Sequence, residues 1–379
     1  MTTSSASAVF LRPVEPDGVP QALTAALQGG DPVAPLPLQQ AERRVALGVL
    51  QLDRPVIEPD AAAVFLTSGS TGQPKGVVLS RAAIAASVTA THERLGGPGD
   101  WVLALPTNYV AGLMVAARAL LAGTELHTVT ADLTSLPSTV SRMAGRRYIS
   151  LVPTQLVRAM REARLSHALA QFDAVLVGGA AADPGLLSAA RALDIAVVTT
   201  YGMSETCGGC VYDGAPLAGV RVDVELDSDR IRLCGPMLFS GYRLRPDLTH
   251  DVLRDGRLFT PDRGRWRHGR LSVLGRIDDV VISGGVNVDL AAVERRAAAW
   301  PGLSDGEVAV VGLPDADWGT RVTAVLAGGG SAEDLLRWLR QDLPTAAVPR
   351  SATKVAKLPR TTSGKIDRQR LTAELSGKT

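Results

Sequence analysis

Short apolar runs alternate with helical segments through the middle of the chain. The apolar runs predict buried strands at residues 62–66, 101–105, 125–130, 148–152, 174–177 and 196–200. The segments between them predict helices, such as residues 110–121 and 184–193, and the second has Asp183 as its N-cap and Pro184 at its first position. Because strands that alternate with helices usually pair in parallel, residues 65–202 are expected to form an α/β structure.

The pattern changes after Gly202, where pairs of short extended runs surround tight turns. One turn has the sequence Asp-Ser-Asp at residues 227–229, and the other is His268-Gly269. The flanking runs are residues 220–226 with 230–233, and residues 265–267 with 270–274. Short turns between extended runs predict antiparallel hairpins, here a small distorted β-barrel.

A further change of pattern at residues 276–279 indicates a domain boundary. Beyond it, strands are predicted at residues 308–311 and 321–326, and a helix at residues 332–343. Residues 1 to about 60 are rich in proline and predict a partly helical cover. We therefore expect an α/β protein with a large N-terminal domain, residues 1–275, of mixed α/β layers plus a distorted β-barrel, and a small α+β C-terminal domain, residues 276–379.

Composition limits the classes of function. The chain has 379 residues, 46% of them hydrophobic and 21% charged, and a net charge of only +2, so no basic field indicates a nucleic-acid or membrane partner. Three cysteines are too few for a disulfide scaffold and fit a reducing cytoplasm. Cys207 and Cys210 have the spacing of a redox motif, but no thioredoxin-like pattern surrounds them, so we interpret the spacing as incidental.

No targeting or spanning segment is predicted. The first nine residues lack a basic stretch before an apolar core, which argues against a signal peptide. The apolar stretch 102–123 is interrupted by Asn108 and Arg118, so it predicts a strand plus a buried helix, not a membrane span. A cytoplasmic location is expected.

Residues 67–76, Thr-Ser-Gly-Ser-Thr-Gly-Gln-Pro-Lys-Gly, are the most informative stretch. They follow the predicted strand 62–66 and precede an alanine-rich segment that Ser80 could cap as a helix. A strand, a loop of glycines and hydroxyls and a helix form a common phosphate-binding arrangement, although composition alone also fits an ordinary flexible turn. The loop is not a Walker A motif, because Lys75 is followed by Gly76 instead of Ser or Thr, and it contains no G-x-G-x-x-G.

Residue by residue, this loop resembles the phosphate loop of the adenylate-forming (acyl-CoA synthetase) superfamily. Four further segments, residues 201–206, 258–262, 275–279 and 358–365, continue the resemblance in the same order. The resemblance implies an ATP site at Thr67, Ser68, Gly69, Ser70, Thr71, Gly72, Lys75, Gly179, Ala180, Tyr201, Gly202, Met203, Ser204, Asp262 and Arg276. Thr67 would also be catalytic. Pro261 stands where the superfamily usually has glycine.

The resemblance also assigns roles to single residues. Glu205 would be catalytic as a ligand of the Mg²⁺ that accompanies ATP, since Mg²⁺ prefers carboxylate oxygens. Tyr201 would stack near the adenine, and Asp262 and Arg276 would bind the ribose. For a glutamate in isolation, a solvated loop position is the alternative.

Three positions near the C-terminus would serve two different steps. By the resemblance, Lys365 would neutralise charge in the transition state of adenylation. Gly284 and Gly285 would line the tunnel that admits the CoA thiol. Because both sets belong to the same small domain, that domain would be mobile and would rotate about Asp278 between the steps.

The substrate pocket is similar to that of the o-succinylbenzoate–CoA ligase (MenE) family of menaquinone synthesis. Residues 105–112, 150–156 and 204–214 carry this similarity. Arg118 lies in an otherwise apolar helix and needs an anion, because an unpaired buried guanidinium is costly. The family implies that this anion is the substrate carboxylate, with Ser150, Tyr109 and Gly179 also binding the acid; a protein carboxylate is the alternative. Asn108-Tyr109 departs from the family's aromatic-His pair.

The resemblance implies an AMP-forming acid–thiol ligase that uses ATP with Mg²⁺ and CoA. Two rivals stay open. One is a ligase for another aryl or acyl acid, acting on CoA or on a carrier-protein thiol. The other is a non-catalytic nucleotide-binding regulator, against which the presence of Glu205 and Lys365 argues.

Overall fold

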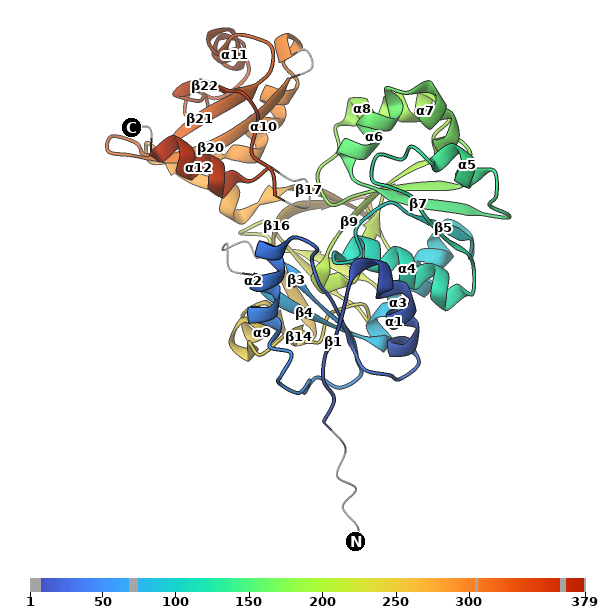
Figure 1. Cartoon of the computed structure of the whole chain (residues 1–379). Coiled ribbons are helices and arrows are strands. Elements are labelled where there is room, and N and C mark those ends of the chain that lie inside the picture. The colour runs from blue at the N-terminus through green and yellow to red at the C-terminus, as the bar shows by residue number, and fades with distance from the viewer. Residues whose placement is uncertain (1–7, 68–73, 304–305, 362–365, 378–379) are drawn as a thin grey trace. The chain divides into compact units, whose positions relative to one another are not determined.

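The computed structural model describes residues 8–67, 74–303, 306–361 and 366–377. The chain divides into two compact units, one of Met1–Asp223, Arg232–Phe259 and Arg267–Leu271, the other of Val224–Ile231, Thr260–Trp266 and Ser272–Thr379 (Figure 1). Parts of the predicted hairpins therefore group with the C-terminal residues. A domain boundary between residues 275 and 276 stays a prediction.

A seven-stranded sheet, in the order β11-β10-β9-β8-β7-β5-β6, is the centre of the larger unit within the described residues. Its strands are β5 (Asp100–Leu103), β6 (Leu126–Thr128), β7 (Arg147–Leu151), β8 (Ala174–Val177), β9 (Val197–Met203), β10 (Gly208–Tyr212) and β11 (Ala215–Pro216). Strands β5 to β9 pair in parallel, which confirms the predicted parallel α/β arrangement. The observed ends lie within a few residues of the predicted ones.

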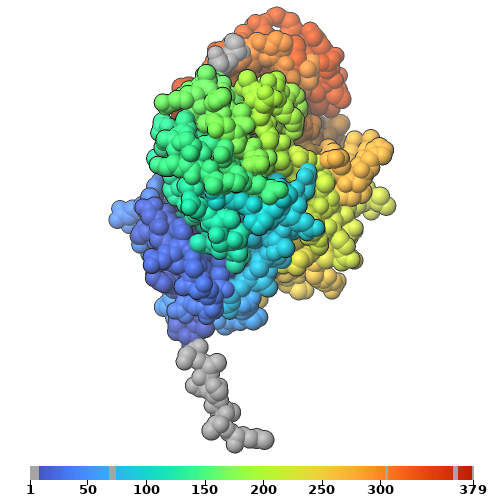
Figure 2. Space-filling view, turned by 90° about the vertical axis from the view of Figure 1, so that its right-hand side faces the viewer, coloured from blue at the N-terminus to red at the C-terminus, as the bar shows by residue number. Residues whose placement is uncertain are grey.

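Helices cover both faces of this sheet. Successive side chains of each strand point to opposite faces, and since both sets are apolar, both faces are buried under helices. On one face, alternate strand residues such as Ile149 and Val175 pack against α5 (Leu136–Val140), α6 (Pro153–Met160), α7 (Ala163–Leu169) and α8 (Pro184–Ala192). On the other face, Trp101 and Tyr148 pack with α3 (Arg81–Leu95) and α4 (Val110–Ala122). Figure 2 shows the residues coloured from cyan to green side by side on one face of the molecule.

A second sheet of the larger unit, in the order β1-β2-β3-β4-β14, corrects one expectation. Its strands are β1 (Arg12–Val14), β2 (Val33–Pro35), β3 (Ala61–Thr67), β4 (Lys75–Ser80) and β14 (Gly241–Tyr242). The loop 67–76 was expected to lead into a helix, but β3 and β4 form an antiparallel hairpin in which Thr67 pairs with Lys75. The buried side chains of Val77, Val78 and Leu79 favour this extra strand. Helix α3 starts only after Ser80, whose side chain accepts a hydrogen bond from the Ala83 N–H as the predicted N-cap.

The first sixty residues are partly helical, as predicted, but they also contribute β1 and β2. Their helices are η1 (Pro16–Gly18), α1 (Val19–Leu27) and α2 (Gln40–Leu50). The segment after α2 is held by Arg243, which is 1% exposed. The Arg243 guanidinium donates hydrogen bonds to the backbone oxygens of Leu50, Gln51, Arg54 and Pro55, at 2.6–3.2 Å. These bonds satisfy a buried charge with backbone dipoles instead of a carboxylate.

Both predicted hairpins after Gly202 are present in a third sheet. Its strands are β12 (Arg221–Val224), β13 (Arg230–Cys234), β15 (Leu253–Arg254), β16 (Arg257–Arg267) and β17 (Arg270–Arg276). Helix α9 (Pro246–Val252) directly precedes β15. His268 and Gly269 both have positive φ, 51° and 71°, which suits a tight turn between antiparallel strands. Pro261 lies inside β16 without ending it.

The C-terminal part has a separate sheet and core. Its strands are β18 (Val280–Ser283), β19 (Val286–Asp289), β20 (Glu307–Asp315), β21 (Gly319–Ala327) and β22 (Ser351–Val355), and its helices are α10 (Leu290–Ala298), α11 (Ala332–Leu339) and α12 (Arg368–Ser376). Helix α11 is shorter than the predicted 332–343, because residues 340–343 form turns ahead of Pro344.

The apolar stretch 102–123 contains the end of strand β5 and the whole of helix α4, so it forms a strand and a helix as predicted. Among the residues that the structure describes, no helix combines the length and the apolar composition needed to cross a bilayer.

Candidate active site

A pocket opens at the carboxyl ends of β7, β8 and β9, beside α4. It has about 580 Å³ of space between its walls, including its open mouth. Ligands of parallel α/β sheets bind at this edge, because the loops that follow the strands diverge there. Four of the predicted residues, Arg118, Ser150, Gly179 and Gly202, line it.

Glycines give the pocket its depth. A Cβ at Gly202 would lie 2.0 Å from the backbone oxygen of Gly208, so no side chain fits between β9 and β10. Gly179 follows β8 with a φ of 79°, a conformation that favours glycine. The predicted role of these glycines is consistent with the space that they leave open.

Arg118 and Ser150 offer unpaired polar groups at the pocket. Arg118 is 4% exposed and Ser150 is 8% exposed. Neither the Nε of Arg118 nor the Oγ of Ser150 has a hydrogen-bond partner. Among the described residues no carboxylate forms an ion pair with Arg118, so the protein-carboxylate alternative finds no support there. A buried cation without an anion indicates an anionic ligand.

Glu205 belongs to a second polar cluster, which the sequence reasoning only partly identified. Glu205 lies in η2 (Ser204–Thr206), directly after β9. Its Oε1 accepts a hydrogen bond of 2.7 Å from the Tyr242 hydroxyl on β14. The Nζ of Lys75, at the start of β4, lies 4.9 Å from the centre of the Tyr242 ring. Tyr242 therefore contacts both Glu205, the predicted Mg²⁺ ligand, and Lys75 of the β3–β4 hairpin, which carries the predicted phosphate loop.

Tyr242 was missed because no motif marks it. It reaches Glu205 through the pairing of β14 with β4, across 37 residues of sequence. Burial and the negative charge of Glu205 raise the pKa of Tyr242 above its ordinary value, so the phenol keeps its proton and donates to the carboxylate.

The remaining ATP-site predictions on this unit are distributed as follows. Tyr201, Gly202 and Met203 end β9, Ser204 begins η2, and Ala180 is exposed in the loop after β8. Thr67 ends β3, opposite Lys75. Ser68, Gly69, Ser70, Thr71 and Gly72 lie outside the described residues. Tyr109 is the N-cap residue of α4 and is not among the residues that line the pocket.

Asp262, Arg276, Asp278, Gly284 and Gly285 belong to the smaller unit. Arg276 and Asp278 form an exposed ion pair of 3.2 Å around η3 (Ile277–Asp279). A Cβ at Gly284 would lie 2.6 Å from the ring of Trp318, and its φ is 57°, so packing and backbone both favour glycine. Lys365 lies outside the described residues.

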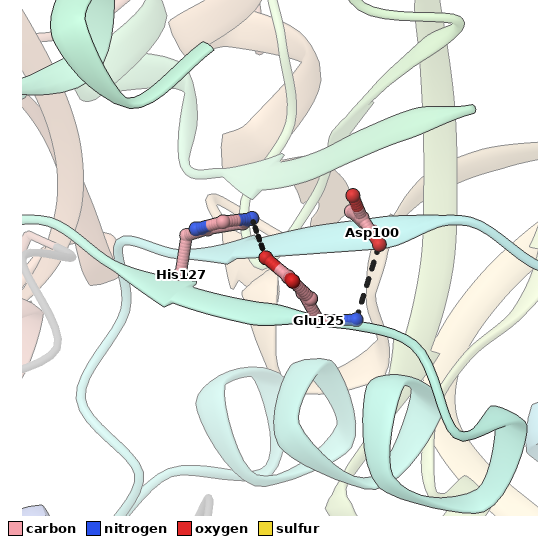
Figure 3. A group of neighbouring side chains, drawn as sticks. All are labelled: Asp100, Glu125 and His127. Atoms are coloured by element: carbon pink, nitrogen blue, oxygen red, sulfur yellow. Dashed lines mark hydrogen bonds and ion pairs between the residues drawn. The ribbon is translucent and has the colours of Figure 1, made fainter. Parts of the chain in front are cut away.

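A different group of possible metal ligands lies on strand β5 and around β6. It consists of Asp100, Glu125 and His127 (Figure 3). Both carboxylate oxygens of Asp100 already accept backbone N–H groups, from Glu125 at 3.1 Å and from Ala144 at 3.2 Å. Glu125 is exposed and pairs with the His127 ring. We therefore interpret this group as a structural tie between neighbouring strands.

The two cysteines with redox spacing are buried and unpaired. Burial raises the pKa of Cys210 to about 12 and raises the pKa of Cys207 further. Since the thiolate is the reactive form, burial disfavours redox chemistry at both thiols.

Comparison with known proteins identifies the family. Residues 1–246 match the family described as AMP-binding enzyme, and residues 304–365 match the AMP-binding enzyme C-terminal domain. Over 370 residues the chain is 42% identical to the probable 2-succinylbenzoate–CoA ligase of Mycobacterium tuberculosis, covering 94% of this chain and 95% of that protein. The chain belongs to the 2-succinylbenzoate–CoA ligase family of AMP-binding enzymes. The superfamily suggested by the ten-residue loop is thereby confirmed.

Other similar proteins agree with this family assignment. The chain is 30% identical over 337 residues to the 2-succinylbenzoate–CoA ligase of Bacillus mycoides, covering 82% of this chain and 70% of that protein. The structure of an E. coli MenE variant with bound OSB-AMS superposes with a TM-score of 0.78 at 26% identity, covering 99% of this chain and 90% of that chain. The structure of an ATP-bound RpMatB-BxBclM chimera gives a TM-score of 0.77 at 27% identity, covering 97% of this chain and 79% of that chain. The predicted fold class is confirmed.

Proposed function

We infer that this AMP-binding enzyme is an acid–thiol ligase that activates o-succinylbenzoate with ATP and transfers it to CoA. The family membership supports the reaction class, since the relatives are ligases of 2-succinylbenzoate and CoA. The observation that carries the choice of acid is the buried Arg118, which lines the pocket without an anionic partner in the described residues. A dicarboxylate leaves one free anion for Arg118 after the other carboxylate has been activated.

The reaction has two balanced steps. In the first, a carboxylate oxygen of the acid bonds to the α-phosphorus of ATP, and the bond to the β-phosphate breaks to release pyrophosphate. In the second, the CoA sulfur bonds to the acyl carbon and AMP leaves, while the thiol proton is lost. The product, o-succinylbenzoyl-CoA, belongs to menaquinone biosynthesis.

The residues of the larger unit serve the first step. Glu205 provides a carboxylate oxygen for Mg²⁺, which would neutralise the phosphate charge when bound. The Tyr242 hydroxyl fixes the position of that carboxylate, and Lys75 places a positive charge beside the same ring. Thr67 and the loop after it would bind the phosphates, while Arg118 and Ser150 would hold the free carboxylate of the acid.

Glu205→Gln is expected to raise the Mg²⁺ concentration needed for half-maximal pyrophosphate release, about tenfold, and to lower turnover. The amide keeps the shape of the side chain but loses the charge that attracts the metal. Tyr242→Phe is the matched control, because it keeps the carboxylate and removes only the 2.7 Å hydrogen bond, so its shift should be smaller. An unshifted Mg²⁺ titration of Glu205→Gln with normal turnover would show that Glu205 is structural.

Arg118→Ala is expected to lower kcat/KM for o-succinylbenzoate by about tenfold to a hundredfold, through loss of a charge-assisted hydrogen bond. Pyrophosphate release with 4-oxo-4-phenylbutanoate, which lacks the ring carboxylate, should change much less. Equal losses with both acids would mean that Arg118 supports the fold and does not select the substrate. Thermal melting of both proteins separates this outcome from unfolding.

A panel of aromatic acids, with and without CoA, tests the function as a whole. The expected result is pyrophosphate release and a free CoA thioester with o-succinylbenzoate. Release without a free thioester, followed by acylation of a carrier protein, would favour the carrier-protein alternative. Absence of acid-dependent pyrophosphate exchange with every acid would favour a non-catalytic regulator.

A further inference from the structure

Two aromatic side chains hold Arg118 from different directions. Tyr212 comes from β10 and Trp101 from β5, and both are fully buried. The Nη2 of Arg118 lies 3.4 Å from the Tyr212 hydroxyl oxygen. The centre of the Trp101 ring lies 4.9 Å from the Arg118 Cζ, within range of a cation–π contact.

Two hydrogen bonds fix the position of the Tyr212 hydroxyl. A guanidinium can only donate, so the Tyr212 oxygen accepts from Arg118. The same hydroxyl forms a second hydrogen bond, of 3.2 Å, with the Oγ1 of Thr91 on α3, in which either hydroxyl can donate; Thr91 is fully buried. This chain fixes the phenol and, through it, one end of the guanidinium.

Trp101 is held in turn by a neutral side chain, that of His92. The Nε1 of Trp101 donates to the Nε2 of His92 at 3.3 Å, so that nitrogen carries no proton. Burial and the nearby charge of Arg118 lower the pKa of His92 to about 4. His92 therefore stays neutral near pH 7, and Arg118 keeps an uncompensated positive charge among the residues that hold it.

The guanidinium is therefore fixed on two sides and unpaired on a third. Its Nε has no hydrogen-bond partner, and the Oγ of Ser150, which lines the same pocket, also has none. An acid without a second carboxylate would leave both groups desolvated and unsatisfied. Selection against such an acid is strongest when the guanidinium cannot turn to another partner.

We propose that Tyr212 and Trp101 are positioning residues that hold the Arg118 guanidinium toward the pocket and thereby set the preference for a dicarboxylic acid. The proposal deepens the proposed function and rests on it, because it requires that Arg118 meets the free carboxylate of the substrate. Tyr212 also lines the pocket beside Arg118, whereas Trp101 does not. Their effect is on selection among acids, expressed in KM more than in kcat.

Tyr212→Phe tests the proposal in the full-length enzyme. Pyrophosphate release is measured with o-succinylbenzoate and with 4-oxo-4-phenylbutanoate. We expect KM for o-succinylbenzoate to rise about fivefold, the loss of one hydrogen bond, with kcat within about twofold. The ratio of kcat/KM between the two acids should fall by the same factor.

Tyr148→Phe is the matched control. Tyr148 is also fully buried and packs on Trp101 with ring centres 5.0 Å apart. Its hydroxyl shares one proton between the backbone oxygens of Leu95 and Gly97, at 3.1 and 2.9 Å, and forms no hydrogen bond with Arg118. This variant should lower the melting temperature without changing the ratio between the acids.

A double-mutant cycle gives an independent measurement. In the Arg118→Ala background, Tyr212→Phe should have no further effect on the ratio, because the group that it positions is gone. Should Tyr212→Phe fail to fold, Thr91→Val, which removes the hydroxyl that bonds to Tyr212, is expected to lower the ratio in the same direction by about twofold to fivefold.

The proposal is overturned if Tyr212→Phe folds and leaves the ratio unchanged, if Tyr148→Phe lowers it equally, or if the effects of Tyr212→Phe and Arg118→Ala simply add. These results differ from failure of the proposed function. In that case the unmodified enzyme would release no pyrophosphate with o-succinylbenzoate, whereas failure of the positioning role alone leaves its activity intact and its selectivity independent of Tyr212.

Discussion

Replacing Lys365 by alanine is expected to reduce acyl-adenylate formation by about 10²–10³-fold, while thioester formation from preformed acyl-adenylate continues. The superfamily resemblance places its ammonium against the charge that develops on the carboxylate and the α-phosphate. Lys365 lies outside the described residues, but residues on either side of it make defined contacts. Arg360 pairs with Ile366 in an isolated β-bridge, and the guanidinium of Arg368 binds both carboxylate oxygens of Glu294.

The two half-reactions are measured separately on one preparation. Pyrophosphate exchange reports adenylation, and added acyl-adenylate with CoA reports thioester formation. Lys357→Ala is a suitable control, because Lys357 is exposed and belongs to no predicted site. Equal damage to both half-reactions would contradict the assignment of Lys365 to the first step.

Asp278→Pro is expected to separate the same half-reactions in the opposite sense. We expect pyrophosphate exchange to stay near normal and CoA thioester output to fall by more than about tenfold. Asp278 is in the middle of η3, between β17 and β18. Proline fixes φ near −65° and restricts the residue before it, so a turn that must change its φ and ψ is confined to one conformation.

The control is Asp278→Ala, which removes the same carboxylate and its ion pair with Arg276 but leaves the backbone free to rotate. Because an exposed ion pair contributes little, this variant should retain most of the thioester output. Unchanged turnover in Asp278→Pro would mean that the two steps need no rotation at this residue. A thermal melt of each variant checks that the fold is intact.

The sequence predicted the parts of the fold that depend on local patterns. Continuous apolar runs identified β7, β8 and β9, and a serine before an alanine-rich run identified the start of α3. The turn at His268-Gly269 was recognisable because its residues tolerate positive φ. Strand β4 was missed, since its residues follow a glycine-rich loop and the helix N-cap lies at its end.

The candidate site was predictable to the same extent. A charge in an apolar helix marked Arg118, and Gly179, Gly202 and Ser150 line the same pocket as Arg118. The partners of these residues were not predictable. Tyr212 reaches Arg118 across 94 positions and Thr91 across 121 positions, and such contacts exist only once β10 packs beside α3 and α4.

The Arg243 contacts also constrain the order in which the molecule can fold. The four backbone oxygens that it binds lie 188–193 positions earlier in the chain, and β14 pairs with β4, which lies more than 150 positions earlier. The sheet β1-β2-β3-β4-β14 therefore cannot be completed during synthesis until residues 241–243 have left the ribosome. Contacts of such high sequence separation slow folding and prolong the exposure of an unpaired strand edge. This sheet, which contains the β3–β4 hairpin around the predicted phosphate loop, is thus among the last parts of the larger unit to become protected from aggregation.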